Sequence, residues 1–149
     1  MNLINKRIII HLYKRIKNKI VLILNYCILF KNIYLIFINE LFKKLGIFYY
    51  NKNYIIKLWN GLKFEIRPNT WDIKILYEIF YKKIYTPIYI KIPENAIVID
   101  IGAYIGDFSI YIAKNYKQSK IYSYEPSPNN FHLLKNNICF NLTFSSYFL

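Results

Sequence analysis

The sequence predicts an α/β fold, in which a parallel sheet follows a β-hairpin and an N-terminal α-helical block. Three observations support this prediction. An apolar run, Ala96–Ile99, leads into Asp100 and two glycines, after which apolar residues recur at helical spacing. A second strand-like run, Lys120–Glu125, begins shortly after the expected end of that helix. Upstream, Asn60-Gly61 separates two segments of alternating polarity, which is typical of a hairpin.

Composition leaves two explanations for a strongly basic chain. The 149 residues can form one domain with a modest core, since 55% are hydrophobic and 19% aromatic. A net charge of +13 ordinarily favours an anionic partner, either a nucleic acid or a membrane surface. Nearly all of the basic residues are lysines, however, and Ile, Asn, Tyr and Phe abound as in proteins encoded by A- and T-rich DNA. The charge therefore need not form a binding patch.

The cysteines and histidines predict no metal site and no nucleophile. Cys27 and Cys139 are far apart in apolar surroundings, and we interpret them as small core residues in a reducing environment. His11 and His132 have no partner at metal-ligand or catalytic-triad spacing, so we expect surface or half-buried rings. The catalytic residue stays unknown.

Residues 1–50 form a basic block that we expect to fold as two or three amphipathic helices. Asn25 and the pair Lys31-Asn32 interrupt its apolar stretches, so a transmembrane span is the less favoured interpretation. The helices either pack on the rest of the chain with a solvated lysine face or lie on an anionic membrane surface. Gly46 should end the last helix. The block contains one acid, Glu40, and nine basic residues: Lys6, Arg7, Lys14, Arg15, Lys17, Lys19, Lys31, Lys43 and Lys44.

Residues 51–92 are expected to hold the hairpin and a helix. Asn60-Gly61 predicts a type I′ turn, in which both residues have a positive φ. Alternation places Leu62, Phe64 and Ile66 on one face of the second hairpin strand. The residues of the expected helix are Trp71–Tyr81, with Thr70 as N-cap, Asp72 in the first turn and Ile73, Leu76, Tyr77 and Phe80 on its apolar face. Between Pro87 and Pro93 we expect a short extended segment.

Residues 93–149 should form the parallel sheet with its helices. The run through Ile99 is typical of a strand buried on both faces. Ser127 and Pro128 are good residues for the start of a helix that ends at Asn141. Three apolar residues of that helix are at core spacing: Phe131, Leu134 and Ile138. The last eight residues are compatible with a third strand or an unstructured tail.

The chemistry should gather at the carboxyl ends of the two parallel strands. A strand, a glycine turn and a helix together direct backbone N–H groups toward a ligand at the helix N-terminus. An acid at the end of the next strand, here Glu125, is placed to accept hydrogen bonds from ribose hydroxyls. The spacing of Gly102 and Gly106 differs from G-x-G-x-x-G, and no Gly-Lys-Ser/Thr follows, which excludes a P-loop.

The motif Asp-x-Gly-x-x-x-Gly with a later Tyr-Glu-Pro resembles the S-adenosylmethionine site of Rossmann-like methyltransferases. The fuller runs VIDIGAYIGDFS, YEPSPNNF and LLKNNI, together with the upstream segment that begins at Asn60, are more narrowly similar to the FkbM family. The resemblance extends from Ile55 to Asn141. It implies a Rossmann-like methyltransferase sheet with more strands than this chain supplies, so we expect a truncated, N-terminal part of such a domain.

The resemblance also implies a cofactor site. Gly102 and Gly106 would admit the methionine part of S-adenosylmethionine, and Asp100 would face its ammonium group or the water around it. Glu125 would bind both ribose hydroxyls, and Asp107 would either cap the helix or touch the cofactor. Tyr104 departs from the family, which has Asn at this place. The full set of expected cofactor-binding residues is Asp100, Gly102, Ala103, Tyr104, Gly106, Asp107, Glu125 and Pro126.

The implied activity is methyl transfer from S-adenosylmethionine, with O-methylation of a small molecule, sugar or lipid and no nucleic-acid partner. A different class is kept open: a basic protein that binds a membrane surface or nucleic acid through residues 1–50. An inactive methyltransferase remnant is the third interpretation. We expect a cytoplasmic protein, with peripheral membrane contact through residues 1–50 as the alternative.

Overall fold

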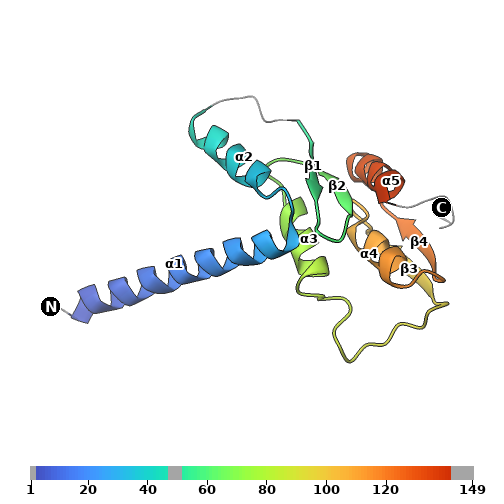
Figure 1. Cartoon of the computed structure of the whole chain (residues 1–149), viewed down its shortest axis with the longest axis horizontal. Coiled ribbons are helices and arrows are strands. Elements are labelled where there is room, and N and C mark those ends of the chain that lie inside the picture. The colour runs from blue at the N-terminus through green and yellow to red at the C-terminus, as the bar shows by residue number, and fades with distance from the viewer. Residues whose placement is uncertain (1–2, 47–51, 142–149) are drawn as a thin grey trace.

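A computed structural model describes residues 3–46 and 52–141, and it has the predicted α/β organisation (Figure 1). The chain order of helices and strands alternates in its second half, as expected for a parallel sheet with crossover helices. The elements are α1 (Leu3–Leu29), α2 (Tyr34–Lys44), β1 (Tyr54–Lys57), β2 (Lys63–Ile66), α3 (Asp72–Phe80), β3 (Ile97–Ile101), α4 (Asp107–Asn115), β4 (Lys120–Tyr124) and α5 (Pro128–Asn141).

The N-terminal block contains two helices within its described part. Helix α1 has 27 residues and continues through Asn25, and it projects away from the other elements (Figure 1). Helix α2 ends at Lys44, and Gly46 follows with a φ of 68°, which agrees with the predicted stop. Among the described residues, none of the helices has the length and apolar content needed to cross a membrane.

The hairpin is present, but its turn differs from the predicted type. β1 and β2 pair antiparallel, with Tyr54 opposite Ile66 and Lys57 opposite Lys63. The Leu58 amide donates to the Leu62 carbonyl at 2.9 Å, which closes a three-residue loop. Only Gly61 of this loop has a positive φ, of 91°, so the predicted type I′ turn at Asn60-Gly61 is wrong. A type I turn followed by a left-handed glycine satisfies the strand twist equally well.

Asparagine side chains occupy both outer edges of this hairpin. Along β1, Asn32 donates to the Ile55 carbonyl at 2.9 Å and accepts from the Lys57 amide at 2.7 Å. Along β2, Asn141 of α5 donates to the Lys63 carbonyl at 2.6 Å and accepts from its amide at 2.8 Å. These amides satisfy backbone groups that an exposed edge strand would leave unpaired.

One hydrophobic core connects the hairpin with the helices around it. The predicted inward face of β2 is confirmed, since Leu62, Phe64 and Ile66 are buried. These side chains pack with Leu76 of α3 and Ile110 of α4, and with others that complete the cluster: Phe30, Ile56, Leu58, Ile105 and Leu133. The cluster draws residues from all three predicted segments, 1–50, 51–92 and 93–149, and the division into those segments stays a prediction.

Helix α3 follows the prediction in extent and orientation. Leu76 and Tyr77 are buried and Ile73 and Phe80 are partly buried, as expected for its apolar face. Trp71 occupies the N-cap position instead of Thr70, whose hydroxyl accepts a hydrogen bond from the Asp72 amide at 3.3 Å. The segment between α3 and β3 contains no strand in this structure.

The sheet β3–β4 is parallel, but only one face is covered. Val98 lies opposite Ile121 and Asp100 opposite Ser123 in the register, and α4 packs on this face. The prediction that β3 is buried on both faces is therefore wrong, because every second side chain of this strand is exposed. Within the described residues no element packs over Ile97, Ile99 and Ile101, which are 68%, 62% and 83% exposed.

Three further expectations are corrected or fall outside the described residues. Cys27 and Cys139 are exposed free thiols instead of core residues. Helix α5 begins at Pro128 and ends at Asn141 as predicted, but Phe131 is exposed and Leu133 is buried in its place beside Leu134. The reason is that α5 packs Leu133 and Asn137 against the hairpin, and Leu134 against Gly106. The possible strand in residues 142–149 lies outside the described part of the chain.

Candidate functional site

The glycine loop between β3 and α4 is folded against the end of β4. Gly102 and Ala103 donate their amides to the Tyr124 carbonyl, at 2.8 and 2.9 Å. Gly102, Tyr104 and Gly106 all have positive φ angles, of 80°, 52° and 84°. Glycine adopts this region without strain, whereas a tyrosine adopts it at a cost. The predicted loop is therefore tightly wound, and its conformation depends on the contacts of Tyr104.

The two glycines differ in what surrounds them. A Cβ atom at Gly102 would meet nothing within 4 Å, so this position faces open space. A Cβ atom at Gly106 would lie 3.4 Å from Cγ of Leu134 in α5. Gly106 thus serves the packing of α4 against α5, and its contact with a cofactor stays a prediction. Gly102 keeps the room that the approach of a ligand to the backbone requires.

A cleft of about 590 Å³ opens beside this loop, between α3, the end of β3 and the start of α4. Three of the expected site residues with side chains line it, Asp100, Tyr104 and Asp107, together with Gly102. Its other walls are largely apolar: Ile75, Glu78, Ile79, Ile84, Tyr85, Ile99, Ile101 and Phe108. Glu125 does not line this cleft.

Asp107 has the most unusual environment in the cleft. Its residue is 3% exposed, and Oδ1 accepts a hydrogen bond from the Phe108 amide at 2.9 Å. The other oxygen, Oδ2, is buried and has no hydrogen-bond partner. Burial, with a smaller contribution from the negative charge of Asp100, raises the pKa of Asp107 to about 7. A buried carboxylate with a free oxygen is costly unless a cationic or hydrogen-bonding group joins it.

Asp100 is held by Ser109, which is itself hydrogen-bonded to Ser123. Oγ of Ser109 in α4 donates to Oδ2 of Asp100 at 2.6 Å, and the same Oγ lies 2.6 Å from Oγ of Ser123 in β4. Burial raises the pKa of Asp100, and the charge of Glu125 raises it further, while the Ser109 hydroxyl opposes the shift. The contact positions the carboxylate at the end of β3, as the sequence predicted, but with one oxygen already bonded.

Glu125 binds the loop and the start of α5. Its Oε2 accepts from the Tyr104 amide at 2.8 Å, and its Oε1 accepts from the Ser127 amide at 2.9 Å. Asn130 of α5 also donates to Oε1, at 3.2 Å. Glu125 therefore fixes the residue that precedes α5 as well as the loop, and it is still half-exposed at the end of β4. Each carboxylate oxygen has two lone pairs, so further donors can still be accepted.

A network that sequence reasoning missed supports Tyr104. Its hydroxyl donates a short hydrogen bond to Oδ1 of Asp72, and the Arg67 guanidinium lies 5.1 Å from its ring centroid. Burial and the hydrogen bond to Asp72 raise the pKa of Tyr104, so the hydroxyl stays protonated as a donor. The Tyr104 side chain is thus anchored away from β4, on the first turn of α3.

Asp72 and Arg67 form the centre of this network. Oδ2 accepts from the Arg67 amide at 2.8 Å and Nε at 3.1 Å, and Oδ1 accepts from the guanidinium at 2.8 Å. Burial favours a raised pKa for Asp72, but the hydrogen bonds from Arg67 and Tyr104 hold it below its ordinary value. Arg67 also donates to Asn130 at 2.7 Å. Since Asn130 binds Glu125, a continuous chain of contacts joins α3, the hairpin, α5 and the end of β4.

A compositional signal could have drawn attention to Arg67. The chain has only three arginines among 21 basic residues, and this one follows the hairpin directly. An arginine in a chain whose basic residues are nearly all lysines indicates a position that requires the planar, bidentate hydrogen bonding of a guanidinium. Asp72 and Asn130 had no comparable signal, because their contacts depend on how distant elements pack.

The arrangement can hold a ligand but offers no obvious proton-transfer pair. Three carboxylates line the cleft; Glu78 is paired with Lys74 and Lys82, whereas Asp100 and Asp107 have no cationic partner among the ion pairs of the described residues, and Gly102 leaves room at the loop. Among the described residues, no group of three His, Cys, Asp or Glu side chains is placed to hold a metal ion. Ala103 is buried in the loop and Pro126 is exposed after Glu125, so neither directs a functional side chain into the cleft.

Comparison with known proteins identifies the relevant family. Residues 56–144 match the model described as the TRM5/TYW2 methyltransferase domain. "Methyltransferase sdnD" of Sordaria araneosa is 38% identical over 71 residues, which cover 46% of this chain and 27% of that protein. "Methyltransferase 1" of Beauveria bassiana is 34% identical over 61 residues, which cover 41% of this chain and 24% of that protein. The chain therefore spans about a quarter of the length of these two relatives.

Among solved structures, M. jannaschii TYW2 in complex with AdoMet aligns at 24% identity with a TM-score of 0.48. The alignment covers 66% of this chain and 43% of that one. These matches name methyltransferases, as the sequence predicted, but they do not show the FkbM family that the motifs resemble.

Proposed function

Because the chain belongs to the TRM5/TYW2 methyltransferase domain family, we propose that its glycine loop binds S-adenosylmethionine for methyl transfer. A fold alone does not determine a ligand, so the proposal rests on the residues of the loop and of the cleft beside it. Those residues supply an open backbone position at Gly102 and the carboxylates of Asp100 and Asp107. Glu125, at the end of the neighbouring strand, adds a further acid against the loop.

The observation that carries the proposal is the free buried oxygen of Asp107. Oδ2 has no hydrogen-bond partner, and the residue lines the cleft at the N-terminus of α4. A ligand with an ammonium group would satisfy this oxygen and stabilise the ionised carboxylate. The α-ammonium of the methionine moiety is such a group, and the open position at Gly102 lies at the same cleft. The residues present therefore fit this cofactor.

We assign distinct roles to the three acids. Asp107 and Asp100 would hold the ammonium end, with Ser109 fixing the orientation of Asp100. Glu125 would bind the ribose hydroxyls, and its contacts with the amides of Tyr104 and Ser127 fix its position at the end of β4. The Arg67–Asp72 pair acts at a distance from the ligand, by holding Tyr104 and Asn130.

The chemistry of the bound cofactor is the transfer of a methyl group from its sulfonium to an acceptor nucleophile. The contribution of this chain is to bind and orient, because alignment of two reactants lowers the barrier without a covalent intermediate. A base that deprotonates the acceptor is not assigned to any described residue.

For the acceptor, we propose O-methylation of a small molecule, sugar or lipid, in the manner of the FkbM family that the run from Ile55 to Asn141 resembles. The matching family supports neither this finer assignment nor the exclusion of nucleic acid. Transfer of a radiolabelled methyl group to small-molecule extracts and to total RNA, assayed side by side, separates the two acceptor classes. Label in RNA alone would overturn the small-molecule proposal.

The binding proposal is tested by calorimetric titration of S-adenosylmethionine into the full chain and two variants. We expect Glu125→Gln to weaken binding at least about tenfold, since a charged hydrogen bond to each ribose hydroxyl is lost. Glu94→Gln is the matched control, because Glu94 is an exposed acid that does not line the cleft. Equal affinities for wild type and Glu125→Gln would exclude Glu125 from the ribose site.

A further inference from the structure

Helix α1 leaves most of its length without a packing partner in the described structure. The side chains described between Arg7 and Leu24 are all exposed, and contacts with the other elements begin at Asn25, which donates to the Tyr77 hydroxyl at 2.9 Å. At 1.5 Å per residue, the projecting part reaches about 25 Å beyond the domain (Figure 1). The exposed side chains of this helix are therefore available to pack against another surface.

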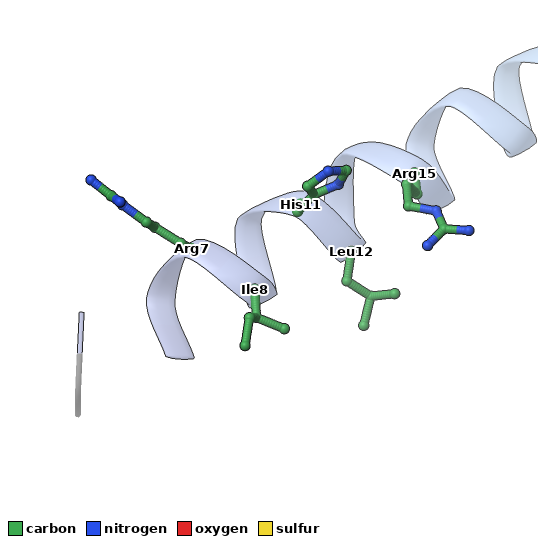
Figure 2. A pocket seen from close by; sticks show the side chains of 5 residues that line it. All are labelled: Arg7, Ile8, His11, Leu12 and Arg15. Carbon is green, nitrogen blue, oxygen red and sulfur yellow. The ribbon is translucent and has the colours of Figure 1, made fainter. Parts of the chain in front are cut away.

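The exposed part of α1 separates apolar and basic side chains. Residues three or four positions apart share a face of a helix. One stripe consists of Ile8, Leu12, Ile16, Ile20 and Ile23, of which Ile8 is 60% and Leu12 is 55% exposed. Figure 2 shows Ile8 and Leu12 pointing to one side of the helix, with Arg7 and His11 directed elsewhere. The separation is partial: Lys19 lies within the stripe and Arg15 borders it, while the exposed side chains of Ile10, Val21, Leu22 and Leu24 lie outside it.

The charge of α1 is of one sign. Its 27 residues contain no acid and six basic residues: Lys6, Arg7, Lys14, Arg15, Lys17 and Lys19. A second copy of α1 would place these cations beside their equivalents, without the complementary acids that stabilise paired helices. Nucleic acid would use the cations but would leave the apolar stripe in water. An anionic lipid surface accommodates both features, because its headgroups neutralise the cations and its acyl boundary receives the apolar side chains.

Helix α2 adds a second uncovered apolar stripe. Its exposed residues Tyr34, Phe37 and Leu41, with Leu45 at its C-cap, follow one another at helical spacing, and Lys43 and Lys44 lie in its last turn. The N-terminal block thus carries a second exposed apolar stripe with basic residues beside it.

We propose that α1 lies on an anionic membrane surface, with the stripe from Ile8 to Ile23 buried at the headgroup boundary. The helix binds parallel to the surface, since it lacks the apolar length to cross a bilayer. The site is independent of the glycine loop, so it tethers the domain to a membrane whether or not the cofactor proposal holds.

The test is co-sedimentation of the full chain with vesicles at low ionic strength. Vesicles of phosphatidylcholine alone are compared with vesicles that also contain phosphatidylglycerol. We expect binding at least about tenfold tighter to the anionic vesicles, and loss of that binding as salt screens the charges. Equal binding to both vesicle types, or none to either, would overturn the proposal.

Paired variants locate the surface. Ile16→Glu should abolish binding, whereas Ile88→Glu makes the same change at an isoleucine that is 99% exposed outside the N-terminal block. Lys14→Glu should weaken binding about tenfold, and Lys117→Glu, with the same net charge, should not. Circular dichroism confirms that Ile16→Glu keeps its helix. Equal effects within either pair would overturn the proposal, as would a dimer in sedimentation equilibrium that Ile16→Glu dissociates.

Discussion

Asn137 of α5 holds the main chain of Glu65 as a neighbouring strand would. Its Oδ1 accepts from the Glu65 amide at 2.6 Å, and its Nδ2 donates to the Glu65 carbonyl at 3.2 Å. The same Nδ2 donates to the Ile105 carbonyl at 2.9 Å, within the glycine loop. A single buried side chain therefore fixes the hairpin, α5 and the loop relative to one another.

Asn137→Ala should destabilise the protein by about 3 kcal/mol, because it leaves buried backbone groups without partners. Asn129→Ala on the exposed surface of α5 should change the free energy of unfolding by less than about 0.5 kcal/mol. Urea unfolding followed by circular dichroism measures both. Similar losses in the two variants would show that the edge contacts of Asn137 are not important for stability.

The Arg67–Asp72 pair makes a second prediction. Asp72 is fully buried, so Arg67→Ala leaves its charge uncompensated and should cost about 3 kcal/mol of stability. Arg67→Lys should also destabilise, since an ammonium cannot reproduce the fork of hydrogen bonds. Arg15→Lys on α1 is the control and should have no measurable effect. A thermal midpoint of Arg67→Lys equal to wild type would contradict the bidentate role.

Replacing each of the two loop glycines by alanine should lower the stability by different amounts. Alanine at either position is strained, because both have a positive φ, and each change should cost about 1 kcal/mol. Gly106→Ala should cost more than Gly102→Ala, since its new methyl group contacts Leu134 whereas Gly102 faces open space. Thermal unfolding of the two variants compares these costs. Equal losses of stability would mean that Leu134 accommodates the new methyl group at no cost, so the α4–α5 contact does not require glycine at position 106.

Asp107 predicts how stability depends on pH. Its pKa of about 7 in the folded state lies above that of an unfolded carboxyl, so the folded state binds the proton more tightly. The contribution of Asp107 is therefore full below about pH 4 and decreases as the pH rises toward 7. Asp107→Asn should flatten the decline in unfolding free energy between about pH 4 and about pH 7, the interval between its unfolded and folded pKa. An unchanged slope would contradict the burial of this charge.

Much of the fold could be predicted from the sequence because its signals are local. The β3–α4 turn is marked by its glycines, α5 by Ser127 and Pro128 at its start, and the hairpin by alternation around Asn60-Gly61. The turn type was wrong because two loops of different length satisfy the same Asn-Gly signal. The exposed face of β3 was missed because an apolar run does not reveal which neighbours cover it.

The site was predictable only in part, for a related reason. The positions of Asp100, Asp107 and Glu125 follow from where two strands end and a helix starts. The contacts of Arg67 and Asn130 follow from how distant segments pack, and no spacing in the sequence encodes them. Asn137 and Asn141 also had no signal, since asparagine is common throughout this chain.

The most direct test of the cofactor site is a calorimetric titration of S-adenosylmethionine into wild type and Asp107→Asn, in buffers of different ionisation enthalpy near pH 6.5. We predict that wild-type binding releases a proton, because an ammonium group beside Oδ2 would lower the raised pKa of Asp107. Asp107→Asn should bind at least about tenfold more weakly and without proton release. Equal affinity in both proteins, with no buffer dependence, would contradict the assignment of the cleft to the cofactor.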